Sequence, residues 1–310
     1  MELFILYRRQ NMLSFHIPDF RKNLRLNLIL LDFYRIRRNR FIDGMTIEYI
    51  YDSFPLIWNG GRFVRGKTDF AEAEKTIRTL NEKGLKIAFT FTNSLLTAEH
   101  LKDPDCNRIM RLASGTGIRN SVIVNSPLLE NYIRVNYPDF GIILSTTRQL
   151  DSASALNEAL KRDYDFVVLD YNMNHDWDAL SRIAPELRNK CEFLVNACCK
   201  DDCPFRGDHY REISRQQLLN GDPAAAGQIP FVPCRWERST YFTYRNYRNF
   251  MGIREIREKY EPMGFCHMKL EGRDGDPIHL LENYVQYLVK EEYRDETRYD
   301  LLQFFINSRK

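Results

Sequence analysis

Short apolar runs alternate with longer amphipathic stretches along most of the chain. Runs of four to seven residues rich in Val, Ile, Leu and Phe predict buried strands, and the stretches between them predict helices. The predicted strands are residues 45–51, 86–92, 121–124, 141–144, 165–169 and 192–195. The predicted helices are residues 23–38, 70–83, 103–114, 128–137, 151–162 and 177–189. Strands that alternate with helices usually pair in parallel, so this order indicates repeated βαβ units.

Two more segments bring the strand count to eight. Residues 246–251 and 265–270 are the additional predicted strands, followed by helices at 252–260 and 277–291. The strands are largely apolar throughout, as expected when both faces of a sheet are buried. About eight βα units make a TIM barrel, and 310 residues are sufficient for one. We therefore predict an α/β fold, a (β/α)8 TIM-type barrel over residues 12–295, with a helical tail over residues 296–310.

The segment 196–244 is too long for an ordinary connection, and we predict that it is an insertion at the C-terminal mouth of the barrel. It begins NACCKDDCPFRGDH and carries four cysteines. Thiolates this close repel one another and oxidise easily unless a metal or cluster holds them, and both zinc and iron–sulfur sites use close cysteine pairs with distant ligands. Buried structural cysteines are the alternative, but the polar neighbours disfavour it. The predicted metal ligands are Cys198, Cys199, Cys203 and Cys234.

Polar residues follow the predicted strands at the end of the barrel where active sites lie. Side chains at these positions converge on one pocket, where amides and guanidinium groups orient a polar ligand. Asn and Asp also end strands for reasons of turn geometry alone, so roughly half of them are expected to do no more. The candidate binding residues are Asn59, Arg62, Asn125, Arg148, Asp170 and Asn196.

The segment MKLEGR near the end of the chain is a sharper signal. Glu271 and Arg273 follow a buried strand and are separated by one glycine. An acid beside an arginine suits anion binding combined with proton transfer. A structural ion pair that closes the barrel is the equally simple alternative.

The order of several short motifs resembles the U32 peptidase family. These are NSPL, an apolar strand ending in STTRQ, LDY, the cysteine cluster and KLEGR, spread over residues 43–291. The resemblance implies a TIM-type barrel with a cysteine-ligated [4Fe–4S] cluster at its mouth. It also implies one of two activities, because several members are implicated in oxygen-independent hydroxylation of tRNA, rRNA or the ubiquinone ring, whereas others were described as collagenase-like proteases.

The resemblance carries over to individual residues of this chain. It implies that Cys199, Cys203 and Cys234 are cluster ligands, with Cys198 as the natural fourth. The two adjacent cysteines depart from the wider spacing of the family, so the fourth position could also belong to Cys266, to His209, to substrate or to an open iron. An open iron would favour substrate chemistry over electron transfer. The catalytic residues that the motif implies are Lys269, Glu271 and Arg273.

Other catalytic classes lack their motifs. The sequence has no radical-SAM cysteine triplet, no Gly-x-Ser-x-Gly and no His-Glu-x-x-His. The main alternative is a structural zinc site in a barrel that binds a ligand or partner, or a peptidase as the family name suggests. The zinc ligands would be Cys199, Cys203, His209 and Cys234.

Composition limits the possible partners and surroundings. The net charge of +3 shows no general basic excess for nucleic-acid binding. Residues 34–40 and 235–248 are locally basic, and the second run mixes arginines with aromatics, which leaves RNA or partner binding as an alternative. Seven clustered cysteines, with no signal peptide and no apolar run near 20 residues, predict a reducing cytoplasm. The expected partners are a small-molecule or RNA substrate and an electron-transfer protein.

Overall fold

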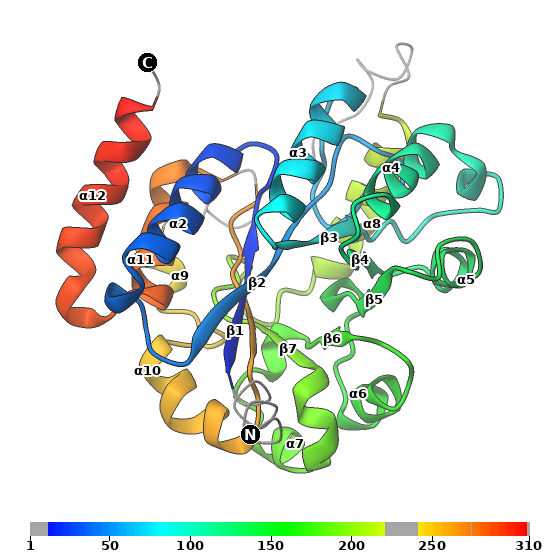
Figure 1. Ribbon diagram of the computed structural model, residues 1–310. Helices are drawn as coiled ribbons and strands as arrows, with labels where there is room; N and C mark the ends of the chain where they lie inside the picture. The colour runs from blue at the N-terminus through cyan, green and yellow to red at the C-terminus, as the bar shows by residue number, and fades with distance from the viewer. Residues whose placement is uncertain (1–11, 221–240, 274, 309–310) are drawn as a thin grey trace, which may run out of the picture.

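Eight parallel strands close into a barrel in the computed structural model, which describes residues 12–220, 241–273 and 275–308 (Figure 1). The strands are β1 (Leu13–Pro18), β2 (Met45–Asp52), β3 (Lys86–Phe91), β4 (Ser121–Val124), β5 (Gly141–Leu144), β6 (Phe166–Val168), β7 (Cys191–Leu194) and β8 (His267–Lys269). Strand β8 pairs with β7 on one side and with β1 on the other, which closes the sheet. The predicted (β/α)8 TIM-type fold is therefore confirmed.

Most helices lie around the outside of the barrel (Figure 1). The helices in the described part of the chain are α2 (Leu24–Ile36), α3 (Phe70–Glu82), α4 (Pro104–Ser114), α5 (Pro127–Asn136), α6 (Ala153–Leu160), α7 (Trp177–Ser181), α8 (Arg206–Leu218), α9 (Tyr241–Tyr244), α10 (Ile253–Glu255), α11 (Pro277–Leu288) and α12 (Arg294–Asn307). Most follow the predicted ranges because caps define their starts. Asp69 accepts from the backbone N–H groups of Ala71 and Glu72 at the start of α3, for example.

One predicted strand is wrong. Residues 246–251 form turns after α9 instead of a strand. The strand that completes the set of eight is β1, which was not among the predicted strands. All six residues of β1 are buried, and β1 occupies the position between β2 and β8, so the barrel has no further edge to pair. The 246–251 segment is held to the end of the barrel by single hydrogen bonds; for example, the N–H of Met251 donates to the carbonyl of Val195 at 2.9 Å.

The predicted helix over 177–189 is shorter than expected. Helix α7 ends at Ser181, and residues Pro185–Lys190 form a 3₁₀ turn. Proline disfavours a helical conformation in the residue before it, and Ala184 accordingly has φ −57° and ψ 134°. The helical path is therefore broken at this point.

Apolar side chains fill two separate layers. The inner cluster, within the barrel, consists of Tyr49, Tyr51, Ala88, Ile123, Ile143, Phe166 and Val168. A much larger cluster between strands and helices includes the fully buried Trp58 and Phe89. Because successive strand residues point to opposite faces, both layers come from the same short strands.

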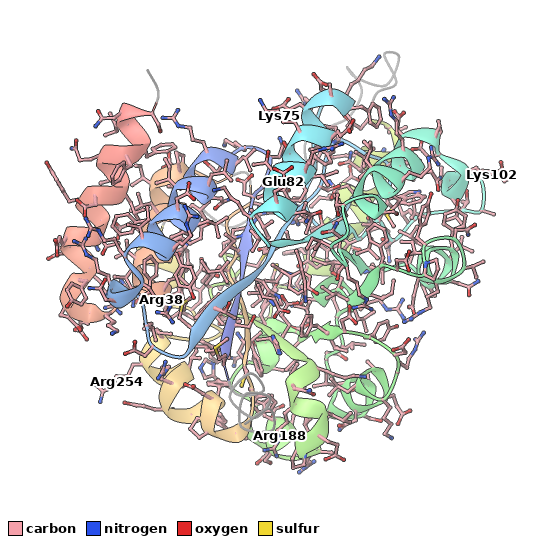
Figure 2. The ribbon with its side chains drawn as sticks, in the orientation of Figure 1. Arg38, Lys75, Glu82, Lys102, Arg188 and Arg254 are labelled. Atoms are coloured by element: carbon pink, nitrogen blue, oxygen red, sulfur yellow. The ribbon has the colours of Figure 1, made fainter. Side chains whose placement is uncertain are left out.

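Many charged side chains lie on the outer surface of the helices. Lys75, Glu82, Lys102 and Arg254 are exposed there, whereas Arg38 and Arg188 are half-buried and donate to backbone carbonyls (Figure 2). Helix α12 packs against α2 and α11 on one side of the barrel (Figure 1). In the part of the chain that the structure describes, no helix combines the length and apolar character needed to cross a membrane.

Candidate functional site

A carboxylate, a guanidinium and a thiol meet at the mouth of the barrel. Glu271 follows β8, and its Oε1 forms an ion pair with Arg62 and accepts a hydrogen bond from Cys198 Sγ at 2.9 Å. The second oxygen, Oε2, accepts from the backbone N–H of Cys198 at 2.8 Å. Arg62 Nη2 also lies 3.3 Å from Cys198 Sγ. These three side chains form the mouth triad, which combines a proton carrier, a fixed positive charge and a sulfur atom.

Asn196 fixes the backbone of Glu271. Its Oδ1 accepts from the N–H of Glu271 at 2.6 Å, and its Nδ2 donates to the carbonyl of the same residue at 3.2 Å. The side chain of Asn196 is buried, so it links the ends of β7 and β8. The predicted binding residue Asn196 is thus placed to position Glu271.

The loop after β2 carries Arg62 to the mouth. Asn59 is fully buried; its Nδ2 donates to the carbonyl of Arg62 at 3.1 Å, and its Oδ1 accepts from Thr90 at 3.0 Å. A Cβ on Gly60 would lie only 2.5 Å from the carbonyl carbon of Thr92. The sequence Asn59-Gly60 therefore lets this loop pack directly on the end of β3.

The close packing at Gly60 gives a testable prediction. Gly60→Ala should lower the free energy of unfolding by about 1–3 kcal/mol, because the backbone of Thr92 must move. Gly115→Ala is the control, since a Cβ there has its nearest neighbour at 4.0 Å. Urea denaturation of both variants measures the difference. An equal change in the two proteins would contradict the packing described here.

Arg273 lies at the mouth without pairing with Glu271. Its Nη1 donates to Thr90 Oγ1 at 2.7 Å, and its guanidinium carbon lies 5.8 Å from the centre of the Tyr51 ring. A Cβ on Gly61 would approach the same guanidinium at 3.4 Å. Glu271 pairs with Arg62 instead, so the acid and the arginine of the MKLEGR motif contact different residues.

Lys269 points into the barrel beneath this layer. Its Nζ lies 3.3 Å from Glu192 Oε1 and 4.1 Å from the centre of the Tyr51 ring. Burial lowers the pKa of Lys269, which the carboxylate of Glu192 partly opposes. The structure therefore places the predicted catalytic lysine in an interior ion pair.

Asp170 anchors helix α8 across the mouth. Its carboxylate forms a two-pronged ion pair with Arg206, with one oxygen 2.9 Å from Nη1. Arg206 also stacks over Tyr171 at 4.7 Å. Further along α8, the side chain of Gln217 forms hydrogen bonds with the N–H and the carbonyl of Val64 in the loop after β2. The predicted insertion over the mouth thus contains a helix held to the barrel.

Asn125 and Arg148 lie next to each other on another part of the mouth. Arg148 Nη1 donates to the carbonyl of Asn125 at 3.1 Å, and Asn125 Nδ2 donates to Thr147 Oγ1 at 2.7 Å. Thr147 in turn lies beside Gly61. The two predicted binding residues therefore border the same loop that carries Arg62.

The cysteines of the insertion differ in their surroundings. The pKa of the Cys198 thiol is raised well above its usual value by its hydrogen bond to Cys199, by burial and by Glu271. The pKa of Cys199 is lowered, mainly by that same hydrogen bond, although burial opposes the shift. Cys203 lies just before α8, where its carbonyl accepts from Arg206. Among the described residues, the three sulfurs do not form a group within 4.8 Å of one another.

The remaining candidate ligands fall in different places. Cys234 lies outside the residues that the structure describes, as do residues 235–240 of the basic aromatic run. His209 is on α8, and burial and Arg62 lower its pKa. Cys266 precedes β8, so it is at the N-terminal end of that strand, opposite the mouth. Its position is incompatible with a role as the fourth ligand.

Sequence reasoning missed several residues that shape the mouth. Thr90 connects Arg273 to Asn59, and burial together with the nearby Cys199 raises the pKa of Tyr210 on α8. Threonine in a strand and tyrosine in a helix carry no distinctive pattern. The docking of α8 onto the barrel, which no local signal encodes, brings Tyr210 into place.

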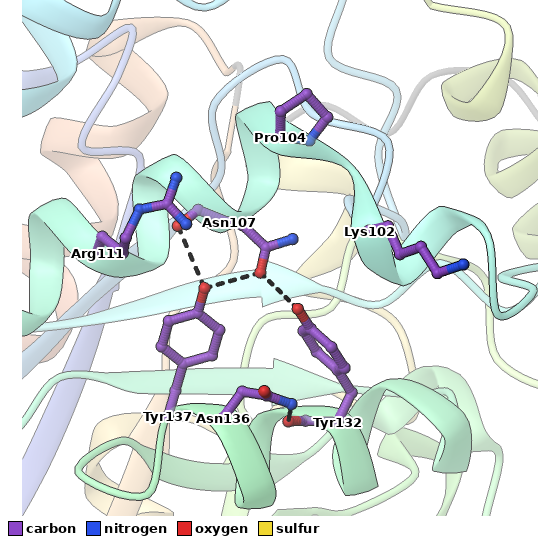
Figure 3. Close-up of a pocket in the computed structure, with 7 residues that line it drawn as sticks. All are labelled: Lys102, Pro104, Asn107, Arg111, Tyr132, Asn136 and Tyr137. Carbon is purple, nitrogen blue, oxygen red and sulfur yellow. Dashed lines mark hydrogen bonds between the residues drawn. The ribbon is translucent and has the colours of Figure 1, made fainter.

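A surface hollow lies away from this site, between α4 and α5 on the outside of the barrel (Figure 3). Asn107 is at its centre, and its Oδ1 accepts from Tyr132 at 2.8 Å and from Tyr137 at 2.7 Å. Lys102 and Arg111 border it. We place the candidate site at the mouth because the acid, the guanidinium and the thiols meet there.

Comparisons with known proteins agree with the motif-based resemblance. No protein-family model matches the chain. The uncharacterized protease MJ1657 of Methanocaldococcus jannaschii is 22% identical over 210 residues, which are 66% of this chain and 61% of that protein. The solved structure of the U32 peptidase Mk0906 aligns with a TM-score of 0.51 and 16% identity, over 84% of this chain and 92% of that one. The chain resembles the U32 peptidases.

The two comparisons carry different information about this U32-like chain. The structural likeness shows a shared barrel fold, because its sequence identity is only 16%. The sequence likeness covers less than two thirds of the length of MJ1657, so this chain corresponds to part of that relative. The chemistry of the mouth is therefore argued from the residues described above.

Proposed function

We propose that this chain is a U32-like barrel enzyme that carries a cysteine-ligated [4Fe–4S] cluster at its mouth. The proposed reaction is oxygen-independent hydroxylation or related redox chemistry on a polar or aromatic small molecule or an RNA base, with an electron-transfer partner, in the reducing cytoplasm. The observation that carries the proposal is the mouth triad, which places a cysteine loop directly beside Glu271 and Arg62.

The donor set fits such a cluster if Cys198 is not a ligand. Its thiol donates to Glu271, and its raised pKa keeps the proton on sulfur. Cys199 has a lowered pKa, as suits the thiolate form that binds metals. Cys199, Cys203 and Cys234 would hold the cluster, which would leave one iron for substrate. When bound, the cluster supplies electron transfer and a Lewis-acidic iron.

The mouth triad prepares a charged and hydrogen-bonded surface for substrate. Arg62 keeps its positive charge, because the carboxylate of Glu271 raises its pKa against the effect of burial. This charge stabilises thiolates nearby. Glu271 lies within hydrogen-bond distance of the Cys198 thiol and is placed to move a proton to or from a bound substrate.

Arg273 and helix α8 have supporting roles. Arg273 has guanidinium N–H groups beyond the one that Thr90 accepts, and these can bind an anionic or carbonyl group of the substrate. Helix α8 crosses the mouth through Arg206 and Gln217 and so limits the access of water. A site that excludes water strengthens the interactions of Glu271 and Arg62 with a ligand.

A zinc site is the alternative for the same loop. His209 lies on α8, and its lowered pKa keeps the imidazole neutral, which is the form that binds metals. Cys199, Cys203, His209 and Cys234 would then form a structural site that holds the insertion in place. The barrel would act as a binding protein or as a peptidase, as the names of its relatives suggest.

Metal and sulfide content distinguishes these alternatives. Protein purified without oxygen should contain about four iron and four sulfide per chain, and Cys203→Ala should lose them together with the visible absorption. Cys106→Ala is the matched control, because Cys106 is buried on α4, outside the mouth. Full iron content in Cys203→Ala would contradict the cluster assignment. One zinc without sulfide would establish the alternative.

A further inference from the structure

A second group of potential metal ligands lies at the opposite end of the barrel from the mouth. His16 on β1, Glu48 on β2 and His267 on β8 each offer one ligand atom, and these atoms all lie within 4.8 Å of one another. Glu48 Oε2 is 3.9 Å from His16 Nε2 and 4.0 Å from His267 Nδ1. The two imidazole nitrogens therefore face the same carboxylate oxygen.

An irregularity in strand pairing directs Glu48 to this point. Phe15 pairs with Ile47, but the next residue, His16, pairs with Tyr49. Glu48 is therefore the extra residue of a β-bulge, which bends a strand and changes the direction of a side chain. The bulge brings the carboxylate of β2 to the histidine of β1.

The histidines have nitrogen atoms without hydrogen-bond partners. His16 is 1% exposed, and its Nε2 makes no hydrogen bond. His267 Nδ1 is also buried and makes no hydrogen bond. Buried polar atoms nearly always have a partner, so two such nitrogens directed at one carboxylate indicate a ligand site. His16 Nδ1 bonds to Glu192 Oε1 at 2.6 Å, which orients the ring with Nε2 toward Glu48.

This arrangement matches the surroundings of metal-bound histidines in proteins. A histidine that binds a metal usually shares its other ring nitrogen with a carboxylate, which fixes the ring and strengthens the ligand. Glu192 has that position here and is itself held by Lys269 at 3.3 Å.

We propose that His16 Nε2, Glu48 Oε2 and His267 Nδ1 bind a divalent transition-metal ion, with Zn²⁺ as the best match. Two histidines and one carboxylate are a common zinc ligand set, and ligand atoms about 2.0–2.1 Å from a tetrahedral zinc lie roughly 3.4 Å apart. The separations of 3.9 and 4.0 Å between Glu48 Oε2 and the two histidine nitrogens need to shorten by roughly half an ångström. Glu48 can supply this movement because its side chain is 28% exposed.

Two other groups touch Glu48 and would remain in place. Lys86 Nζ lies 3.0 Å from Oε1, the oxygen that faces away from the proposed ion, and Ser14 donates to Oε2 at 2.9 Å. A carboxylate oxygen accepts more than one interaction, so Ser14 is compatible with a metal on Oε2. A proton competes with the metal ion for His16, because Glu192 and Glu48 raise the pKa of this imidazole although burial opposes the shift.

The position of the site indicates a structural role. Strands β8, β1 and β2 are neighbours where the barrel closes, and one ion would join all three. The N-terminal end of a TIM barrel contributes to stability, whereas its C-terminal end carries catalysis. The proposal is independent of the cluster at the mouth, since it involves none of the mouth residues.

The test uses the full-length chain in which Cys198, Cys199, Cys203 and Cys234 are all serine, so that the mouth cannot bind metal. Equilibrium dialysis against Zn²⁺ should find one tightly bound ion per chain, and Zn²⁺ should raise the melting temperature. Glu48→Gln should weaken binding at least about 100-fold, and Glu192→Gln about 10–100-fold, because Glu192 only orients a ligand.

A matched control and a second variant complete the experiment. Glu255→Gln removes the carboxylate of a surface pair with His175, at 3.2 Å and similar exposure, and should leave Zn²⁺ affinity unchanged. His267→Gln replaces a second ligand and should lose the ion as Glu48→Gln does. Circular dichroism melts in EDTA establish which variants are folded. The proposal is overturned if the folded parent takes up no Zn²⁺, or if the ligand variants bind it as tightly as Glu255→Gln.

Discussion

Glu192→Gln should lower the free energy of unfolding of the metal-free protein by about 3–5 kcal/mol, because it leaves two basic groups buried without their counter-charge. Glu192 has no exposed surface; it lies 2.6 Å from His16 and 3.3 Å from Lys269. These neighbours lower the pKa of Glu192 to about 2 even though burial opposes ionisation. Urea denaturation in EDTA measures the loss.

An exposed pair provides the comparison for Glu192. Glu158 lies 2.8 Å from Lys161, but the side chains are 71% and 63% exposed, so Glu158→Gln should change stability by less than about 1 kcal/mol. Adding Lys269→Met to Glu192→Gln should recover part of the loss, since it removes the buried ammonium group that has lost its counter-charge. Equal effects of the two single variants would show that Glu192 is not an interior ion-pair partner.

Arg206→Met should produce the second large effect, a loss of about 3–5 kcal/mol or the release of α8 from the barrel, because Asp170 is left as an unpaired buried carboxylate. The side chains of Arg206 and Asp170 are 7% and 0% exposed. Limited proteolysis within residues 196–220 detects release of the helix, and urea denaturation detects global destabilisation.

Arg211→Met is the control on the same helix. Arg211 is 70% exposed and lies 3.5 Å from Asp208, which is 80% exposed, so its replacement should change stability by less than about 1 kcal/mol. Both variants remove one guanidinium from α8 and insert the same side chain. If Arg206→Met were no more sensitive to protease or urea than Arg211→Met, the anchoring of α8 through Asp170 would be wrong.

Local patterns predicted most strands and helices because each buried strand is a short apolar run and most helices have capping residues. They failed for the first strand. Residues 13–18 (LSFHIP) carry a buried histidine and end in proline, whereas 246–251 (NYRNFM) carries two aromatic residues and ends in two large apolar ones, which favours a strand locally. The position of β1 between β2 and β8 depends on pairing across the whole chain, which no local window contains.

For the two sites as well, local motifs predicted the positions of single residues but not which distant residues contact one another. The MKLEGR motif and the strand ends placed Glu271, Asn196 and Arg62 at the mouth, but not the pairing of Glu271 with Arg62. The second ligand group was missed, although a signal was present. His16, Glu48 and His267 each interrupt an otherwise apolar or aromatic strand, and only the closed barrel shows that they face one another.

The pairing order of the barrel has a consequence for the growing chain. Until β8 has been synthesised, the first seven strands can form only an open sheet whose two edges are β1 and β7. Unpaired edges invite association with other nascent chains, and a polar or charged side chain at the edge discourages it. His16 and Glu192 lie on these two strands and become buried together only at closure. Until the barrel closes, each of these two temporary edge strands therefore carries a polar or charged side chain of the interior ion network.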